Sequence, residues 1–155
     1  MEVGAGSGAL TAQLILKLGP QDTLDVVEKD PNFCRVLRKK FGHLPNVSIH
    51  EVSIVDFVAK PFDGLLSSLP LNAFGAPLVG KILKQYENLV KKGGILSYYE
   101  YMGFEKVKKV FLMGDKADDF HKGQELKNQF VSQYSNAVEI IWWNIPPARV
   151  VHCKL

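Results

Sequence analysis

The residues with the clearest chemical potential lie at the start of the chain, in the stretch E-V-G-A-G-S-G from Glu2 to Gly8. Its glycines alternate with other residues, and glycine lets a ligand approach the backbone closely. A helix-like run begins at Ala9, and the free N–H groups at the start of a helix suit a polar or anionic ligand. The stretch therefore predicts a strand-to-helix turn that holds a cofactor, against the alternative of a plain tight turn.

Two classes of cofactor use such a turn. Residues 4–9 satisfy the dinucleotide pattern G-x-G-x-x-A, whereas residues 2–8 satisfy the longer pattern E-x-G-x-G-x-G of S-adenosylmethionine enzymes. Glu28, in V-V-E-K-D-P, follows about 20 residues later, where a carboxylate can accept hydrogen bonds from a ribose diol. Glu28 indicates a nucleoside-containing cofactor without choosing the class, and the longer match favours S-adenosylmethionine.

The elements that must position these residues alternate along the chain. This alternation predicts an α/β fold with helices on both faces of a Rossmann-like sheet. We expect strands at 1–3, 23–27, 47–52, 62–69, 95–100, 138–143 and 149–154, and helices at 9–18, 31–41, 77–92, 104–113 and 117–134. The sheet should have seven strands, mostly parallel, with an antiparallel terminal hairpin around N-I-P-P.

Composition bounds the class of protein. The 155 residues are 46% hydrophobic and 23% charged, which is typical of one globular domain spanning residues 1–155. No apolar run reaches the roughly 18 residues of a membrane-spanning helix, and no signal peptide is visible. Cys34 and Cys153 have no metal-ligand spacing and form no disulfide framework, so we expect a cytoplasmic protein without a metal.

Later stretches narrow the assignment. Together with the first two motifs, they resemble class I S-adenosylmethionine-dependent methyltransferases, most closely bacterial phospholipid (phosphatidylethanolamine) N-methyltransferases and the related rRNA adenine dimethyltransferases. These stretches are S-S-L-P-L-N (67–72), G-G-I-L-S-Y-Y-E-Y (93–101) and W-W-N-I-P-P-A-R-V (142–150). The resemblance implies a seven-stranded methyltransferase sheet, S-adenosyl-L-methionine as cofactor and S-adenosyl-L-homocysteine as product.

The resemblance also implies a set of cofactor-binding residues. They are Glu2, Gly4, Ala5, Gly6, Gly8, Glu28, Lys29, Ser53, Ile54 and Ser68. Ser53 stands where the family usually has an aspartate that touches the adenine amine, and a neutral hydroxyl accepts a hydrogen bond more weakly. Either donor affinity is reduced, or Asp56 has another role.

The residues expected at the methyl acceptor are Ser68, Pro70, Asn72 and Tyr99. Carbonyl groups near Ser68 and Pro70 would orient an amine, and tyrosine rings hold a methylated ammonium by cation–π attraction. Leu71 stands where adenine methyltransferases carry the aromatic residue that stacks on a flipped base, which argues against a base as acceptor.

Other residues near the expected acceptor have more than one interpretation. Tyr98 and Tyr101 are further candidates for the cage, although a strand turns at least one of two neighbours into the core. Glu100 is a base or a salt-bridge partner, and we favour the salt bridge. Alternation along the strand predicts that one of Trp142 and Trp143 is buried and the other exposed. The exposed ring would suit a lipid interface, but we favour the alternative that both tryptophans are structural and cover the sheet.

The sequence thus predicts an N-methyltransferase that acts on a phospholipid amine head group, or another small amine, by in-line methyl transfer. Two basic clusters would suit a phosphate-bearing substrate or anionic lipid, and with it peripheral contact at the inner membrane face. We interpret the first, Arg35, Arg38, Lys39 and Lys40, as a solvated helix face, and favour for this role the second, Lys106, Lys108 and Lys109, nearer the expected acceptor. An rRNA adenine dimethyltransferase, a non-catalytic cofactor-binding domain and a nicotinamide-dependent enzyme stay open as alternatives. Because Met1 lies inside the first strand, we expect the chain to lack an N-terminal segment and part of that strand.

Overall fold

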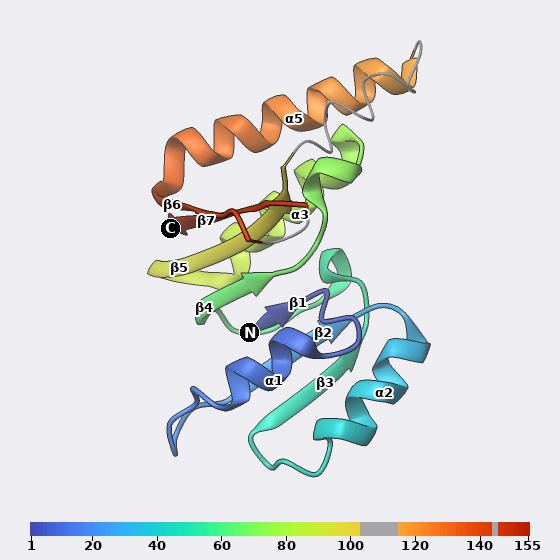
Figure 1. The fold of residues 1–155 in the computed structure, drawn as a ribbon, viewed down its shortest axis with the longest axis vertical. Coiled ribbons are helices and arrows are strands. Elements are labelled where there is room, and N and C mark those ends of the chain that lie inside the picture. The colour runs from blue at the N-terminus through green and yellow to red at the C-terminus, as the bar shows by residue number, and fades with distance from the viewer. Residues whose placement is uncertain (103–114, 144–145) are drawn as a thin grey trace.

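The sheet of the computed structural model has the predicted seven strands, in the order β3-β2-β1-β4-β5-β7-β6 (Figure 1). The structure describes residues 1–102, 115–143 and 146–155. The strands are β1 (Glu2–Val3), β2 (Leu24–Glu28), β3 (Val47–Glu51), β4 (Phe62–Ser67), β5 (Val90–Tyr101), β6 (Ser135–Ile141) and β7 (Ala148–Lys154). β7 runs antiparallel to both of its neighbours and the other pairs are parallel, so the predicted terminal hairpin is confirmed.

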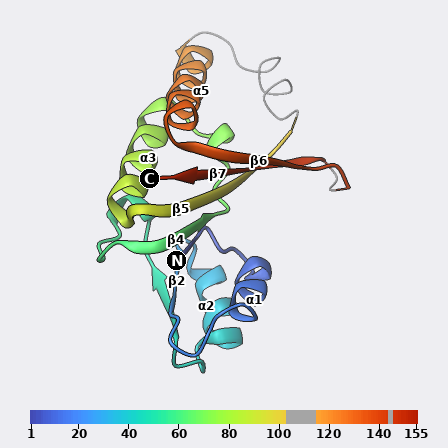
Figure 2. The same cartoon turned by 90° about the vertical axis from the view of Figure 1, so that its left-hand side faces the viewer.

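Helices cover both faces of the sheet, as predicted. They are α1 (Ala9–Ile15), α2 (Pro31–Phe41), α3 (Ala76–Leu89) and α5 (Asp115–Tyr134), with two short 3-10 turns, η1 (Ile54–Asp56) and η2 (Leu71–Ala73). Figure 2 shows α1 and α2 on one side of the sheet and α3 and α5 on the other. None of these helices is long and apolar enough to cross a bilayer, within the described part of the chain.

Local sequence explains the bounds of α2, which match the prediction. The side chain of Asp30 accepts a hydrogen bond from the N–H of Asn32 at 2.8 Å and so caps the helix. Pro31 occupies the first turn, where its fixed φ suits a helix and its missing N–H costs nothing. Cys34 and Leu37 are fully buried, so one face of the helix is anchored to the sheet.

Two predicted helices were too long. α1 ends at Ile15 rather than Leu18, because the chain turns there and packs Leu18 against the smaller of two hydrophobic cores. The buried residues of this smaller core are Ala5, Leu24, Val26, Leu37 and Val47. α3 ends at Leu89 rather than Lys92, because buried Val90 already pairs with Phe62 on β4 and so begins β5. The predicted helix at 104–113 lies outside the described residues.

The prediction that one tryptophan is buried was wrong. Trp142 is 66% exposed and Trp143 is 96% exposed. The strand predicted at 138–143 is β6, which ends at Ile141, so both tryptophans lie in the turn after it and strand alternation does not apply to them. β6 is the last strand of the sheet, and all seven of its residues are exposed.

Candidate cofactor and acceptor sites

A cleft opens at the carboxyl ends of the central strands, where the strand order reverses between β1 and β4. This switch point is where ligands bind in open α/β sheets. We call it the switch-point cleft. Its lining residues are Val3, Gly4, Val27, Glu28, Lys29, Val52, Ser53, Ile54, Leu69, Phe74, Leu78 and Ile82.

The glycine turn lies at one end of this cleft, and no protein atoms fill the space beside its middle residue, Gly6. Gly6 has a φ of 54°, which favours glycine, and a Cβ built on it would meet nothing within 4 Å. A Cβ on Gly4 would lie 2.8 Å from Leu69 Cδ2, and one on Gly8 would lie 2.7 Å from Phe41 Cε2. Packing therefore fixes both ends of the turn and leaves free space beside Gly6.

Glu28 is held by the backbone on both sides. Its Oε2 accepts a hydrogen bond from the N–H of Gly6 at 2.9 Å, and its Oε1 accepts one from the N–H of Asp30 at 2.9 Å. The residue is only 8% exposed, and it lines the switch-point cleft. Each carboxylate oxygen can accept a second hydrogen bond, so the fixed carboxylate still has capacity for a ligand diol.

The far wall of the cleft is an apolar slot. Val52, Ile54, Leu69, Phe74 and Leu78 contribute to it, together with the hydroxyl-bearing Ser53. Apolar walls with a few placed polar groups are typical of sites for flat organic rings. Asp56 is not among the lining residues.

Five of the predicted cofactor residues line the cleft. Gly6 is connected to it by the hydrogen bond that its N–H donates to Glu28. The five are Gly4, Glu28, Lys29, Ser53 and Ile54. Ala5 packs in the smaller core and Gly8 lies against α2, so both shape the turn from behind. Ser68 belongs to a second pocket. Sequence reasoning found Ser53 and Ile54 but missed the other wall residues, for which strand and helix patterning gave no signal distinct from core; these are Val52, Leu69, Phe74 and Leu78.

Glu2 lies beneath the turn and is fully buried. Burial raises the pKa of its carboxyl, and the neighbouring Thr11 opposes part of that rise. Neither carboxylate oxygen has a hydrogen-bond partner of good geometry in the described ranges. Its predicted role in cofactor binding stays a prediction.

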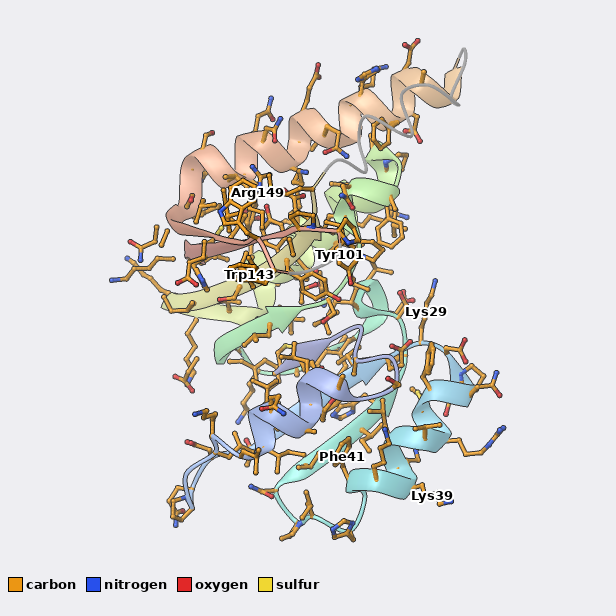
Figure 3. All side chains as sticks on the ribbon, in the orientation of Figure 1. Lys29, Lys39, Phe41, Tyr101, Trp143 and Arg149 are labelled. Carbon is orange, nitrogen blue, oxygen red and sulfur yellow. The ribbon has the colours of Figure 1, made fainter. Side chains whose placement is uncertain are left out.

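A second pocket brings together all four residues predicted at the acceptor. We call it the acceptor pocket, and its lining residues are Ser68, Pro70, Asn72, Tyr99, Glu100 and Tyr101. Leu69 lines the switch-point cleft while its two neighbours in sequence line this pocket, so the two cavities adjoin at the end of β4. In Figure 3, Lys29 and Tyr101 lie toward the same edge of the sheet.

Two tyrosine rings form one wall of the acceptor pocket. The rings of Tyr99 and Tyr101 meet edge to face, with centroids 5.7 Å apart. Burial and the nearby Tyr101 raise the pKa of the Tyr99 phenol, so it stays neutral, with Ser68 as a counteracting neighbour. Tyr98 is 2% exposed and belongs to the core, which removes it as a candidate for the cage.

The short turn η2 faces inward. Leu71 is 1% exposed, so it packs in the core and presents no surface to a ligand. Asn72 is 3% exposed, and its Nδ2 donates a hydrogen bond to the carbonyl of Tyr101 at 3.4 Å. Asn72 therefore ties the end of β4 to the end of β5 across the acceptor pocket.

Glu100 is a salt-bridge partner, as favoured from the sequence. Its Oε2 lies 2.7 Å from Nζ of Lys127 on α5, and its Oε1 pairs with the guanidinium of Arg149 on β7. Lys127 and the carboxylate are both buried. The sequence gave no signal for Lys127, because nothing in α5 marks one of its lysines as an inward-facing residue.

The two predicted basic clusters have different outcomes. On α2, Arg38 pairs with Glu51 at 2.7 Å, and Lys40 donates to the carbonyl of Ser7 at 2.7 Å, beside the glycine turn. The second cluster, Lys106, Lys108 and Lys109, lies outside the described residues. Within the described ranges, no group of three or more His, Cys, Asp or Glu side chains could hold a metal ion.

Comparison with known proteins places these cavities in context. No family model matches the chain. The chain is 26% identical over 101 residues to an ornithine lipid N-methyltransferase from Singulisphaera acidiphila, which covers 61% of this chain and 53% of that protein. It is 37% identical over 92 residues to ribosomal RNA small subunit methyltransferase A from Marinobacter nauticus, which covers 55% of this chain and 31% of that protein. The chain thus spans about half or less of the length of these curated relatives.

Solved structures agree on the fold. The N-methyltransferase NodS from Bradyrhizobium japonicum superposes with a TM-score of 0.74 at 14% identity, covering 99% of this chain and 83% of that chain. The methyltransferase CalH, solved with S-adenosylhomocysteine, gives a TM-score of 0.70 at 18% identity, covering 99% and 50%. The predicted Rossmann-like methyltransferase fold is confirmed, and so is the resemblance to class I S-adenosylmethionine-dependent methyltransferases.

Proposed function

We propose that this chain is an S-adenosylmethionine-dependent N-methyltransferase whose acceptor is the amine of a phospholipid head group. The observation that carries the proposal is the Glu28 carboxylate, fixed by the N–H groups of Gly6 and Asp30 at the switch-point cleft. It joins the two sequence motifs that indicate the cofactor into a single site.

The residues present fit the donor in three places. Glu28 would accept hydrogen bonds from the ribose diol, and the slot lined by Ser53 and Ile54 would take the adenine ring. The open space beside Gly6 would admit the amino-acid end, where a larger residue would project. When bound, this cofactor supplies a methyl group already activated on a positively charged sulfonium.

The chain's contribution to transfer is to place the acceptor and exclude water. Ser68 and Pro70 lie at the junction of the two cavities, where the Ser68 carbonyl would accept a hydrogen bond from an amine that points toward the donor. The Pro70 carbonyl already accepts one from the N–H of Ala73 at 2.7 Å, so Pro70 shapes the pocket. The rings of Tyr99 and Tyr101 would hold a partly methylated ammonium by cation–π attraction of about 0.5–2 kcal/mol each. Glu100 is committed to two cations, so it supports the structure rather than deprotonating the amine.

A lipid amine is favoured over a nucleic-acid base for two reasons. The relative from Singulisphaera acidiphila is named for a lipid substrate and for N-methylation. Leu71, buried at the position where base methyltransferases carry a stacking aromatic residue, offers no ring to a flipped base. A phospholipid substrate would bring the protein to the inner membrane face from the cytoplasm.

The second candidate is rRNA adenine dimethylation. Identity of 37% to ribosomal RNA small subunit methyltransferase A is the observation that favours it. Those relatives extend well beyond the matched region, since the chain covers 31% of the Marinobacter nauticus protein. The acceptor pocket, rather than the donor cleft, distinguishes the two candidates.

One assay separates the candidates. The chain is incubated with methyl-labelled S-adenosylmethionine and with phosphatidylethanolamine vesicles, phosphatidylcholine vesicles or unmodified ribosomal RNA. We expect label in phosphatidylethanolamine and none in phosphatidylcholine, whose nitrogen already carries three methyl groups. Label in RNA alone would establish the second candidate, and no label in any acceptor, despite donor binding, would support a non-catalytic domain.

A further inference from the structure

The edge strand β6 exposes an unusual amount of apolar side chain. Within the described residues it pairs only with β7, and its outer edge has no strand beside it. The large apolar residues of this strand and of the two positions after it are Val138 (49% exposed), Ile140 (41%), Ile141 (45%), Trp142 (66%) and Trp143 (96%). We call these five residues the β6 edge patch.

The β6 edge patch occupies both faces of the strand. The register pairs Val138 with Val151 and Ile140 with Arg149, and Ile141 follows on the opposite face. Figure 2 shows the β6–β7 hairpin projecting away from the body of the sheet. Neither face of this strand is therefore buried by the described helices.

The exposed area is large enough to matter. From these exposures, the β6 edge patch presents on the order of 600 Å² of apolar surface, against about 800 Å² per partner in a standard protein interface. Apolar surface of several hundred Å² on a soluble protein marks interaction sites, and here it is divided between the two faces of one edge strand and the turn after it.

We propose that β6 pairs with β6 of a second copy of this chain, so that two sheets join edge to edge about a two-fold axis. An exposed apolar edge strand presents unpaired N–H and C=O groups that are a template for another strand. A strand paired with its own copy is antiparallel, so the same patch serves both partners. The inference does not depend on the proposed methyltransferase activity.

A second strand fits this surface better than a lipid bilayer does. A bilayer surface is planar and takes a segment that is apolar on one side, whereas this strand is apolar on both. An open strand edge also leaves backbone polar groups unsatisfied in hydrocarbon, at a cost of several kcal/mol each. A partner strand satisfies those groups, and its side chains pack beside those of β6 on both faces as cross-strand pairs.

Charge restricts the register of the pairing. Glu139 is the only charged residue in the strand, and Nε2 of His152 in the same chain lies 3.9 Å from its carboxylate. Like charges directly opposite each other are destabilising in a strand pair. The favoured registers therefore set Glu139 of each copy opposite an apolar residue of the other.

The test is the oligomeric state in solution, measured by sedimentation velocity over a range of concentrations. We expect a dimer with a dissociation constant below about 10 µM. Trp143→Lys should weaken the dimer at least about tenfold, and it cannot disturb the fold much because the side chain is 96% exposed. Ile140→Lys is the second variant, and Val58→Lys, at a 91% exposed apolar residue outside the patch, is the matched control.

Hydrogen exchange supplies a second measurement. Backbone amides on the outer edge of residues 136–141 should exchange more slowly as concentration rises, in the wild type and in Val58→Lys only. A chain that stays monomeric at about 100 µM, or a dimer that Trp143→Lys and Ile140→Lys both leave intact, would overturn the proposal. Monomers recruited to phosphatidylglycerol–phosphatidylcholine vesicles through Trp143 would overturn it in favour of lipid.

Discussion

The N–H of Gly6 donates a hydrogen bond of 2.9 Å to Oε2 of Glu28, which lies 22 residues further along the chain. This bond fixes the open middle of the glycine turn against the acid that ends β2. The same carboxylate accepts a second backbone hydrogen bond from Asp30. One buried group thus organises both motifs before any ligand arrives, and this preorganisation lowers the cost of binding.

Replacing Gly6 with valine should abolish binding of S-adenosylhomocysteine in calorimetry. The added side chain would occupy the free space beside the turn. Gly93→Val is the matched control, because Gly93 also has a positive φ, of 81°, and open space around its Cβ. Both variants carry a backbone strain of about 1–2 kcal/mol, but only Gly6→Val should lose the ligand. Equal affinities would contradict the assignment of the turn.

Replacing Glu28 with glutamine should weaken binding of S-adenosylhomocysteine by about 1.5–3 kcal/mol, the range for hydrogen bonds to charged groups. The control is Glu51→Gln, since Glu51 sits beside Glu28 in the β2–β3 register but is exposed and pairs with Arg38. Calorimetry should find no change for the control. A loss below about 0.5 kcal/mol for Glu28→Gln would count against a ribose contact.

Replacing Tyr99 with alanine removes the ring and should raise the KM for the lipid acceptor about tenfold, since one cation–π contact contributes about 0.5–2 kcal/mol. Tyr99→Phe keeps the ring and should keep most of the affinity. The dissociation constant of S-adenosylhomocysteine should be the same in both variants, because Tyr99 lines the acceptor pocket and not the switch-point cleft. A KM equally raised in the two variants would point to the hydroxyl instead.

Replacing Glu100 with glutamine should lower the free energy of unfolding by about 3–5 kcal/mol, the cost of removing one partner of a buried ion pair. Lys127 loses the carboxylate 2.7 Å from its Nζ while it stays buried. Adding Lys127→Met should restore at least part of the loss, because no buried ammonium then remains. Lys84→Ala, at an exposed pair, should cost less than about 1 kcal/mol. Urea denaturation measures all four proteins, and a double variant less stable than Glu100→Gln would contradict the account.

The buried carboxyl of Glu2 should make stability depend on pH. Burial raises its pKa above the ordinary value of 4.5, so the folded state favours the protonated form. Its stabilising contribution is complete below pH 4.5 and is lost as the pH rises through the raised pKa. Glu2→Gln should therefore raise the Tm at neutral pH and flatten this part of the pH profile, whereas exposed Glu51→Gln should not. An unchanged profile in Glu2→Gln would refute this interpretation.

The sequence predicted most of the fold because the local signals at the ends of helices and strands agree with the pattern of buried residues. Asp30, Pro31 and Gly42 delimit α2, and each has a chemical reason to stand at a helix end. Prediction and structure disagree where pairing with a distant strand decides where an element ends. Val90 lies within a helical pattern, yet its pairing with Phe62 ends α3 and begins β5.

The site was predictable where motifs mark backbone geometry, and unpredictable where packing decides. Glu28 and Ser68 lie at the ends of strands that meet at one edge of the sheet, so the sequence could place them at the same edge, although they line two adjoining cavities. The Glu100–Lys127 pair joins residues 27 positions apart through packing of α5 on the sheet, which no local pattern encodes. The exposure of both tryptophans escaped prediction because β6 ends at Ile141, earlier than the sequence pattern indicates, so they lie in the turn that follows the strand.

The central claim is that the switch-point cleft holds an adenosyl sulfonium donor through Gly6 and Glu28. The most direct test is a calorimetric titration of the chain with S-adenosylhomocysteine, S-adenosylmethionine and NADH. The account predicts saturable binding of the first two at one site per chain, weakened by Glu28→Gln, and no binding of NADH. Binding of NADH in their place, or S-adenosylhomocysteine binding that neither Gly6→Val nor Glu28→Gln affects, would contradict it.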